Sequence, residues 1–292
     1  MDTCEATIDT ENCCRTHEMA VYHVRMQIAD ALKASRLPSI DAEILLGLIL
    51  TKPRAWIIAH ADQEMTQESI DAYHRLSERR RAGEPIAFIT GTKEFYGRDF
   101  IVTPATLIPR PATEHLIDLT VDFLKHPKNR TEVIDTEIVG IARMLSGKIP
   151  TTILDIGTGS GCIAVTLALE GIAQKIIAVD ISDGAIGVAR NNAEKHGAEN
   201  HITFLHGSGA DVIASLQEPF LVVSNPPYIP LGTTLDKTVG DYEPHSALFA
   251  GEKGMDVIKE ILESAMHNNN CTGILLECRG DQVTAIDALL NT

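Results

Sequence analysis

Between residues 18 and 84, hydrophobic and polar positions recur with a helical spacing. Apolar residues recur every three or four positions, as on one face of a helix, in the segments 18–36, 40–50, 56–61 and 66–82. Residues 1–17 are polar and show no period, which predicts a disordered N-terminal tail. We therefore expect a helical domain, which we place at residues 18–84.

The period changes after this domain. Residues 86–104 are rich in aromatic and β-branched side chains and are broken by Gly91 and Gly97, a pattern typical of a β-hairpin. The segment LIPRP at 107–111 follows, and its two prolines predict a stiff loop because proline fixes its own φ and restricts the residue before it. We expect residues 85–111 to link two domains.

Beyond Pro150, strand and helix patterns alternate. Short continuous apolar segments, predicted to be buried strands, lie at 153–156, 176–181, 202–205, 221–223 and 274–276. Helical patterns lie at 161–170, 184–197, 210–217, 255–267 and 281–290. This alternation predicts an α/β domain at 112–292, with a mostly parallel sheet covered by helices on both faces. An amphipathic stretch within 126–150 receives no assignment.

Composition and charge narrow the class of protein. With 44% hydrophobic and 22% charged residues, the chain has the composition of a soluble globular protein. No apolar run approaches the roughly 20 residues that cross a bilayer. A net charge of −15 disfavours binding to phosphate backbones. The first 14 residues contain four acidic and no basic side chains, unlike a signal peptide, so a cytoplasmic protein is expected.

Cysteines and histidines give no sign of a metal centre. The six cysteines form no CxxC pair, and the 11 histidines are scattered with no HExxH arrangement. We interpret the cysteines as reduced thiols and expect no metal site.

A glycine-rich segment follows the first strand of the α/β domain. The strand runs into DIGTGSG at 155–161, and glycines there allow a tight turn and a close approach to a ligand. The next strand ends in Asp180, 19 residues beyond Gly161, where a carboxylate can accept both hydroxyls of a ribose. The pattern indicates a nucleoside-containing cofactor. It leaves a nicotinamide dinucleotide and S-adenosylmethionine open, although GTGSG lacks the spacing of GxGxxG and favours the second.

The fourth strand ends in a second chemical motif, Ser224 to Tyr228, which reads SNPPY. Asn225 offers a side-chain carbonyl, and the carbonyl of Pro226 is held in a fixed direction by the prolines. Tyr228 supplies a flat, partly polar wall. Two hydrogen-bond acceptors and an aromatic face suit a planar NH2 group.

This arrangement can activate a carboxamide nitrogen, whose lone pair is otherwise delocalised. If Asn225 and Pro226 each accept one N–H, the lone pair can turn toward an electrophilic methyl carbon on a sulfonium. Such positioning can supply up to roughly 7–11 kcal/mol in favourable systems. The two acceptors also stabilise the positive charge that develops on nitrogen, and no general base is required.

Five segments together carry a resemblance to a known family. They are GEPIAFITGTKEFYGRDF at 83–100, LIPRP at 107–111, DIGTGSG at 155–161, NPPYI at 225–229 and YEPHSALFAG at 242–251. In this order they resemble the N5-glutamine methyltransferases that modify peptide chain release factors in bacteria and organelles. The resemblance covers about residues 20–290, whereas NPPY alone is shared with adenine and cytosine N-methyltransferases. It implies a Rossmann-like class I methyltransferase fold with a small N-terminal helical bundle joined by a β-hairpin.

The resemblance also implies residue roles. S-adenosylmethionine would bind to Asp155, Gly157, Thr158, Gly159, Ser160, Gly161, Asp180 and Asn225. The catalytic residues would be Asn225, Pro226 and Tyr228, and with Pro227 they would hold the glutamine of a release factor's Gly-Gly-Gln loop. The helical domain would help to dock the release factor. We expect no direct nucleic-acid partner, no membrane partner and a monomer.

The chain departs from the family pattern at several places. Gly207 to Asp211 lacks the usual acidic residue beside the adenine, and Asp211 is the nearest substitute. Ala112 stands where the family has an acidic residue, and an insertion lies within 126–150. The domain is expected to lack its terminal pair of antiparallel strands, because the chain stops after one helix beyond 274–276. The strand at Leu275 would then be an unprotected sheet edge.

Three other functions compete with glutamine methylation. A DNA or RNA base N-methyltransferase shares NPPY, because an exocyclic base amine is also a planar NH2, but it calls for a basic face. A non-catalytic binding protein could result from loss of the terminal strands. A nicotinamide oxidoreductase would need an acid or base for hydride transfer beside the glycine segment, and none is recognisable.

Overall fold

The computed structural model describes residues 26–133, 135, 137–173 and 175–291. The predicted tail, 1–17, therefore lies outside the described residues. The chain divides into two compact units, with the boundary between Ser77 and Glu78. Among the described residues, no helix combines the length and the apolar character needed to cross a membrane.

The first unit is a small helical bundle. Its helices are α1 (Ile28–Ser35), α2 (Ser39–Leu50), α3 (Arg54–Ala59) and α4 (Gln67–Arg81), the last of which continues past the unit boundary. Strands β1 (Met26–Gln27) and β2 (Glu64–Met65) pair antiparallel. The apolar positions that predicted the helices form the buried interior, including Ile28, Leu45, Leu46, Ile57 and Tyr73. Within the described residues, the first predicted helix begins at Ile28 and follows β1.

After the end of α4, the second unit continues with a short helix and a hairpin. Residues 86–90, which the sequence placed in the hairpin, instead form helix α5 (Ile86–Thr90), because its side chains Ala87 and Phe88 pack against Val102 and Ile108. The hairpin itself consists of β3 (Thr92–Phe95) and β4 (Arg98–Ile101). Tyr96 and Gly97 connect the two strands, both with positive φ, as in the type I′ turns that suit twisted hairpins.

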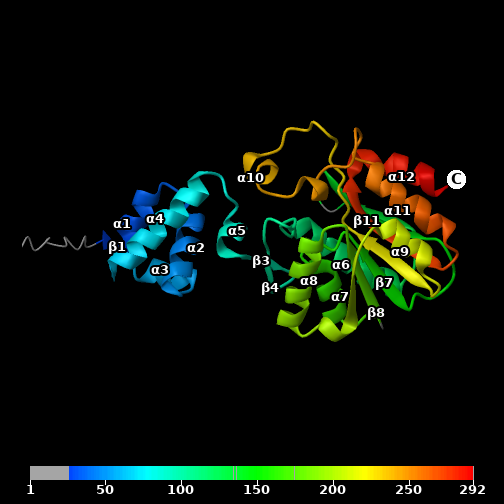
Figure 1. Ribbon diagram of the computed structural model, residues 1–292, viewed down its shortest axis with the longest axis horizontal. Helices are drawn as coiled ribbons and strands as arrows, with labels where there is room; N and C mark the ends of the chain where they lie inside the picture. The colour runs from blue at the N-terminus through cyan, green and yellow to red at the C-terminus, as the bar shows by residue number, and fades with distance from the viewer. Residues whose placement is uncertain (1–25, 134, 136, 174, 292) are drawn as a thin grey trace, which may run out of the picture. The chain divides into compact units, whose positions relative to one another are not determined.

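The rest of the second unit is an α/β fold, which confirms the predicted class (Figure 1). Its seven-stranded sheet has the order β5-β6-β11-β10-β7-β8-β9. The strands are β5 (Arg130–Val133), β6 (Ile138–Met144), β7 (Thr152–Ile156), β8 (Lys175–Asp180), β9 (Ile202–His206), β10 (Phe220–Ser224) and β11 (Cys271–Arg279). The helices are α6 (Pro111–Lys125), α7 (Cys162–Leu169), α8 (Asp183–His196), α9 (Gly209–Ser215), α10 (Lys237–Gly240), α11 (Asp256–His267) and α12 (Val283–Leu290). Strands β7 to β11 are mutually parallel, as predicted.

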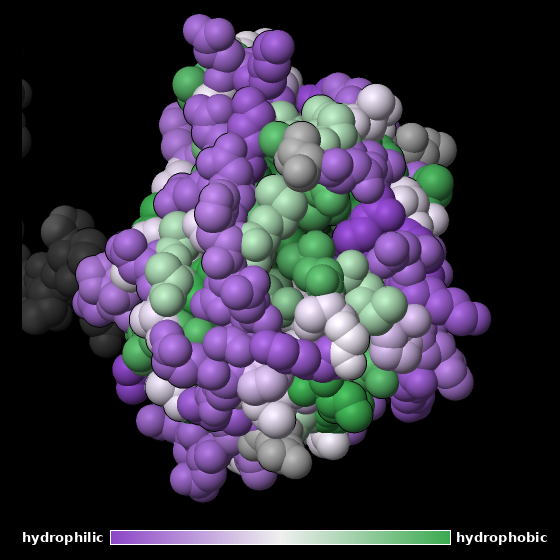
Figure 2. Space-filling model, turned by 90° about the vertical axis from the view of Figure 1, so that its right-hand side faces the viewer, coloured by the Kyte–Doolittle hydropathy of each residue, from purple (hydrophilic) through white to green (hydrophobic). Residues whose placement is uncertain are grey.

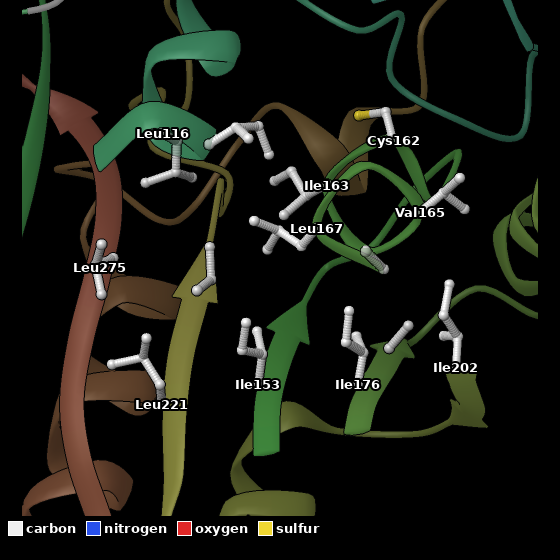
Figure 3. Close-up of a cluster of buried hydrophobic side chains, with 14 of the residues drawn as sticks. Leu116, Ile153, Cys162, Ile163, Val165, Leu167, Ile176, Ile202, Leu221 and Leu275 are labelled. Atoms are coloured by element: carbon white, nitrogen blue, oxygen red, sulfur yellow. The ribbon is translucent and has the colours of Figure 1, made fainter. Parts of the chain in front are cut away.

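Both faces of the sheet are covered, because successive side chains of a strand point to opposite faces. Ile153 belongs to one buried cluster together with side chains of α6 and α7 (Figure 3). Leu154, the next residue, belongs to the cluster on the other face, with side chains of α9, α11 and α12. This double burial explains why the strands read as continuous apolar segments. The outer surface in Figure 2 shows hydrophobic residues gathered near the middle of one face and polar residues around them.

The expectation that the strand at Leu275 is an unprotected edge is wrong. Strand β6 pairs antiparallel with β11, with Ala142 opposite Leu275, and β5 pairs antiparallel with β6. Both added strands come from the insertion within 126–150 that received no assignment. An antiparallel pair therefore does lie beside β11, but it precedes the parallel strands in the chain. A sheet edge can be covered by any segment of suitable pattern, wherever it stands in the sequence.

Candidate active site

The glycine-rich segment forms a tight loop between β7 and α7. Gly157, Gly159 and Gly161 all have positive φ, between 56° and 78°, which side chains rarely adopt. At Gly161 a Cβ would lie only 3.0 Å from the Cβ of Ala189, so α7 can begin close to α8 only with glycine there. Asn192 of α8 braces the loop, since its Nδ2 donates to the carbonyl of Ser160 at 2.8 Å.

Asp155 supports this loop from inside. The residue is fully buried, and its Oδ2 accepts hydrogen bonds from Thr158 Oγ1 at 2.7 Å and from the Ala164 amide at 3.2 Å. Burial raises the pKa of Asp155 to about 7, although the two hydrogen bonds act in the opposite direction. The side chains of Thr158 and Ser160 are also buried. These three residues thus shape the loop from behind rather than presenting their side chains to a ligand.

Asp180 lies at the carboxyl end of β8 and faces the glycine loop. Its Oδ2 accepts a hydrogen bond from the amide of Gly159, and its Oδ1 accepts one from the amide of Ser182, each at 2.9 Å. A carboxylate has about four acceptor positions. The two bonds therefore fix its orientation and leave capacity for the hydroxyl groups of a ligand.

A cavity of about 270 Å³ opens above the carboxyl ends of the parallel strands, where ligands bind in open α/β sheets. Of the sequence-predicted residues, Gly157, Gly159, Asp180, Asn225 and Pro227 line it. Two further segments from the resemblance also reach it, LIPRP through Leu107 and YEPHSALFAG through Pro244, Ser246 and Ala247. Segments far apart in the sequence thus share one cavity.

Asn225 stands at the end of β10, and its amide is held by buried neighbours. Nδ2 donates to Thr113 Oγ1 at 2.9 Å, and the amide also interacts with the carboxyl of Glu277. With the NH2 end turned toward these two partners, the carbonyl Oδ1 is the end that can face a substrate. The predicted role of Asn225 as an acceptor requires this orientation.

Tyr228 turns toward β11 and does not line the cavity. Its hydroxyl donates to Glu277 Oε1 at 3.1 Å. Burial, together with the nearby carboxylate, raises the pKa of Tyr228, so this hydroxyl stays protonated. Pro226 likewise does not line the cavity, whereas Pro227 does. The tyrosine therefore contributes to the site through its bond with Glu277.

Sequence reasoning missed Glu277. It is fully buried on β11 and interacts with Thr113, Asn225 and Tyr228. Burial raises the pKa of its carboxyl, against the opposing effect of these hydrogen bonds. The sequence feature that could have identified Glu277 is its position directly after the apolar segment 274–276. A charge-bearing side chain in a buried strand calls for a partner, and such groups mark functional sites.

Beside the cavity, an ion pair joins the segment LIPRP at 107–111 to the segment YEPHSALFAG at 242–251. Glu243, which is 3% exposed, accepts from Arg110 Nη2 at 2.6 Å and from the amide of Ile108 at 3.0 Å. The LIPRP loop is thereby fixed to the segment that begins at Tyr242. Both partners lie in motifs that the sequence singled out, but their pairing depends on the fold.

Comparisons with known proteins match two family models to this chain, over two ranges of residues. A family model described as the PrmC N-terminal domain matches residues 23–91, and one described as the methyltransferase small domain matches residues 133–240. A release factor glutamine methyltransferase of Koribacter versatilis is 38% identical over 226 residues, 77% of this chain and 72% of that protein. One of Xylella fastidiosa is 35% identical over 266 residues, 90% of this chain and 88% of that protein.

A longer relative matches as well. A bifunctional methyltransferase of Rickettsia bellii is 38% identical over 260 residues, so that this chain spans about half of it, 47%. The two relatives named release factor glutamine methyltransferase are matched over more than two thirds of their own length. The chain therefore belongs to the release factor glutamine methyltransferase family.

Proposed function

We propose that the protein transfers a methyl group from S-adenosylmethionine to the side-chain amide nitrogen of the glutamine in a release factor's Gly-Gly-Gln loop. The observation that carries the proposal is the orientation of Asn225, whose NH2 group faces Thr113 and Glu277 so that its carbonyl can accept from a substrate. Family membership supports the same acceptor. The first unit would help to dock the release factor.

The cavity fits the adenosyl part of the cofactor. Asp180 offers acceptor positions for ribose hydroxyls, and the glycine loop leaves backbone without side chains along one wall. Ile156, Ile181 and Val257 add an apolar lining suited to a planar base. When bound, S-adenosylmethionine supplies a methyl carbon made electrophilic by its sulfonium.

The acceptor amide is the second requirement. Asn225 Oδ1 and the carbonyl of Pro226 would each accept one N–H of the substrate amide, which turns the nitrogen lone pair out of conjugation. The same two oxygens stabilise the positive charge that builds on that nitrogen. Once methylated, the nitrogen loses a proton readily, so the residues around it need only orient and stabilise.

Glu277 is a positioning residue in this scheme. Its Oε1 accepts from the Tyr228 hydroxyl, and its carboxyl lies near the Asn225 amide, where it would keep the NH2 end of Asn225 away from the substrate. Thr113 holds the same end from α6. A flip of Asn225 would present a donor to a donor and abolish the arrangement.

The competing functions receive less support. A base N-methyltransferase shares the SNPPY geometry, but the net charge of −15 opposes a phosphate backbone. The non-catalytic interpretation depended on the expectation that β11 lacks an antiparallel strand pair beside it, and β5 and β6 provide such a pair. A nicotinamide oxidoreductase finds no support in the family membership.

The decisive experiment is transfer of labelled methyl from S-adenosylmethionine to a bacterial release factor. A release factor whose Gly-Gly-Gln glutamine is changed to alanine serves as the control. We expect label only with the intact glutamine. Label on both release factors, or on neither with folded enzyme, would contradict the proposed substrate.

Two variants separate acceptor binding from cofactor binding. Asn225→Ala should lower the rate of methyl transfer by about 100-fold or more, as when one oriented catalytic dipole is removed, and leave the Kd of S-adenosylhomocysteine nearly unchanged. Asp180→Ala should weaken cofactor binding first. Calorimetric titration of both variants checks this, and equal loss of rate and affinity in Asn225→Ala would refute the division of roles.

A further inference from the structure

One end of the cavity is formed by α11 and the segment that begins α9. Val257, Glu260 and Ile261 of α11 line it. These positions follow the i, i+3, i+4 spacing that places side chains on one face of a helix. Glu260 is thus a carboxylate between two apolar residues on the face turned to the cavity.

The opposite segment, Ser208 to Ala210, presents no acidic side chain there. At Gly209 a Cβ would lie 2.5 Å from Cγ2 of Ile156, so the close approach of this segment to β7 requires glycine. Asp211, the substitute suggested by the sequence, is exposed and does not line the cavity. An acidic group at this end therefore comes from α11.

Glu260 is available to a ligand. Of the described residues that line the cavity, Asp180 and Glu260 carry carboxylates, and Asp180 is already held by two backbone amides. Glu260 Oε1 accepts a single long hydrogen bond, at 3.4 Å, from Ser208 Oγ. Ser208 in turn caps α9, since its Oγ accepts from the Ala210 amide at 3.2 Å. Glu260 is exposed at the cavity lining, and its carboxylate keeps acceptor capacity for a ligand.

The chemistry of the lining points to an amino group on a planar ring. A carboxylate accepts from an exocyclic amine, whereas a ring carbonyl at the same position would meet a like partial charge. We propose that Glu260 accepts a hydrogen bond from the 6-amino group of the cofactor's adenine and so selects adenine over other purines. The inference rests on the proposed function, in which the cofactor is S-adenosylmethionine.

Removing either partner of the hydrogen bond tests the proposal by calorimetric titration. The ligands are S-adenosylhomocysteine and its analogue in which hydrogen replaces the 6-amino group. The proteins are the wild type, Glu260→Gln and the matched control Glu263→Gln. Glu263 is exposed on the same helix and lies outside the cavity lining. Both substitutions remove one negative charge from α11, so their difference isolates the contact.

We expect Glu260→Gln to weaken S-adenosylhomocysteine about fivefold, as when a partly exposed charge-assisted hydrogen bond is lost. The affinity for the analogue should change less than twofold by the same reasoning, because the partner amine is absent. Glu263→Gln should leave both affinities unchanged. Equal weakening of both ligands by Glu260→Gln, or no weakening, would overturn the proposal.

Two further outcomes are informative. If Asp211→Asn produces the amine-dependent loss instead, the contact belongs to α9 and the assignment to Glu260 is wrong. If the wild type binds neither ligand, the proposed cofactor fails, which is distinct from failure of the Glu260 contact. Wild-type binding with an unaffected Glu260→Gln variant refutes the contact alone.

Discussion

Glu277 shows how much a single residue can organise in this site. It lies on β11 among buried apolar neighbours, yet its carboxyl interacts with Thr113 at the start of α6 and with Asn225 and Tyr228 of the SNPPY segment. Sequence spacing identified Asn225 as an acceptor, but it gave no means of deciding which end of the amide faces the substrate. The orientation of the amide depends on two distant side chains. Thr113 lies 112 residues before Asn225, and Glu277 lies 52 residues after it.

Replacement of this carboxyl should affect rate and leave cofactor affinity intact. We expect Glu277→Gln to lower kcat about tenfold, because a neutral amide holds Asn225 less firmly than a charge-assisted bond does. The Kd of S-adenosylhomocysteine should stay within about twofold, since Glu277 lies outside the cavity lining. Single-turnover rates and titrations provide the measurements, with Glu263→Gln as the control for a lost surface charge.

The pH dependence distinguishes positioning from a general structural effect. Burial raises the pKa of Glu277, and only the ionised carboxylate makes the stronger charge-assisted hydrogen bonds that the positioning role uses. The wild-type rate should therefore fall as pH decreases through this raised pKa. In Glu277→Gln that limb of the profile should disappear. Retention of the same limb in the variant would show that another group is responsible.

At the scale of elements, the hairpin of β5 and β6 is the main departure from expectation. Its residues carry an amphipathic pattern that is compatible with helix or strand, and its pairing partner lies more than 100 residues later in the chain. Outer strand β5 is largely exposed and carries Arg130 and Glu132, an ion pair at 3.0 Å. Charged side chains of this kind protect a sheet edge from pairing with other molecules.

The hairpin should be essential for the stability of the second unit. Ala142 of β6 is buried within the cluster beneath α6, while Met144 of the same strand is 41% exposed. Ala142→Glu should lower the free energy of unfolding by about 3 kcal/mol or more, because it buries an unpaired charge. The same change at Met144 should cost little. Urea unfolding followed by circular dichroism compares them, and similar losses in both variants would argue against the observed packing of β6.

At the scale of the whole molecule, stability should respond to pH through a buried carboxyl. Burial raises the pKa of Asp155 from an ordinary 3.8 to about 7 in the folded protein. The folded state therefore holds the proton more tightly, and this contribution to stability is complete below the unfolded pKa. It is lost as pH rises from about 4 through about 7. The group thus favours folding most under acidic conditions.

Comparison with Asp155→Asn isolates this contribution. The free energy of unfolding of the wild type should fall relative to the variant as pH rises through that interval, by at most about 4 kcal/mol. The protein's one tryptophan, Trp56, lies in the first unit. Its fluorescence therefore monitors that unit separately while circular dichroism follows both. A pH-independent difference between the two proteins would contradict the raised pKa.

Features that depend on neighbours in the chain could be predicted from the amino-acid sequence. Helical spacing predicts α2, α3 and α4, and continuous apolar segments predict β7 to β11. The glycines of the loop and the prolines of SNPPY indicate constraints on the backbone. The sequence also indicates the family, because those segments keep their order. These features are local, since periodicity and φ preferences act over a few residues.

Features that depend on contacts between distant segments follow from the tertiary structure. Residues 86–90 form a helix whose side chains pack on Val102 and Ile108, and β6 pairs with β11. The fold also brings Glu277 to Asn225 and Glu260 to the cavity. A buried surface or an unpaired strand edge must be satisfied by whichever segment the fold brings to it, and that segment's position in the chain carries no local signature.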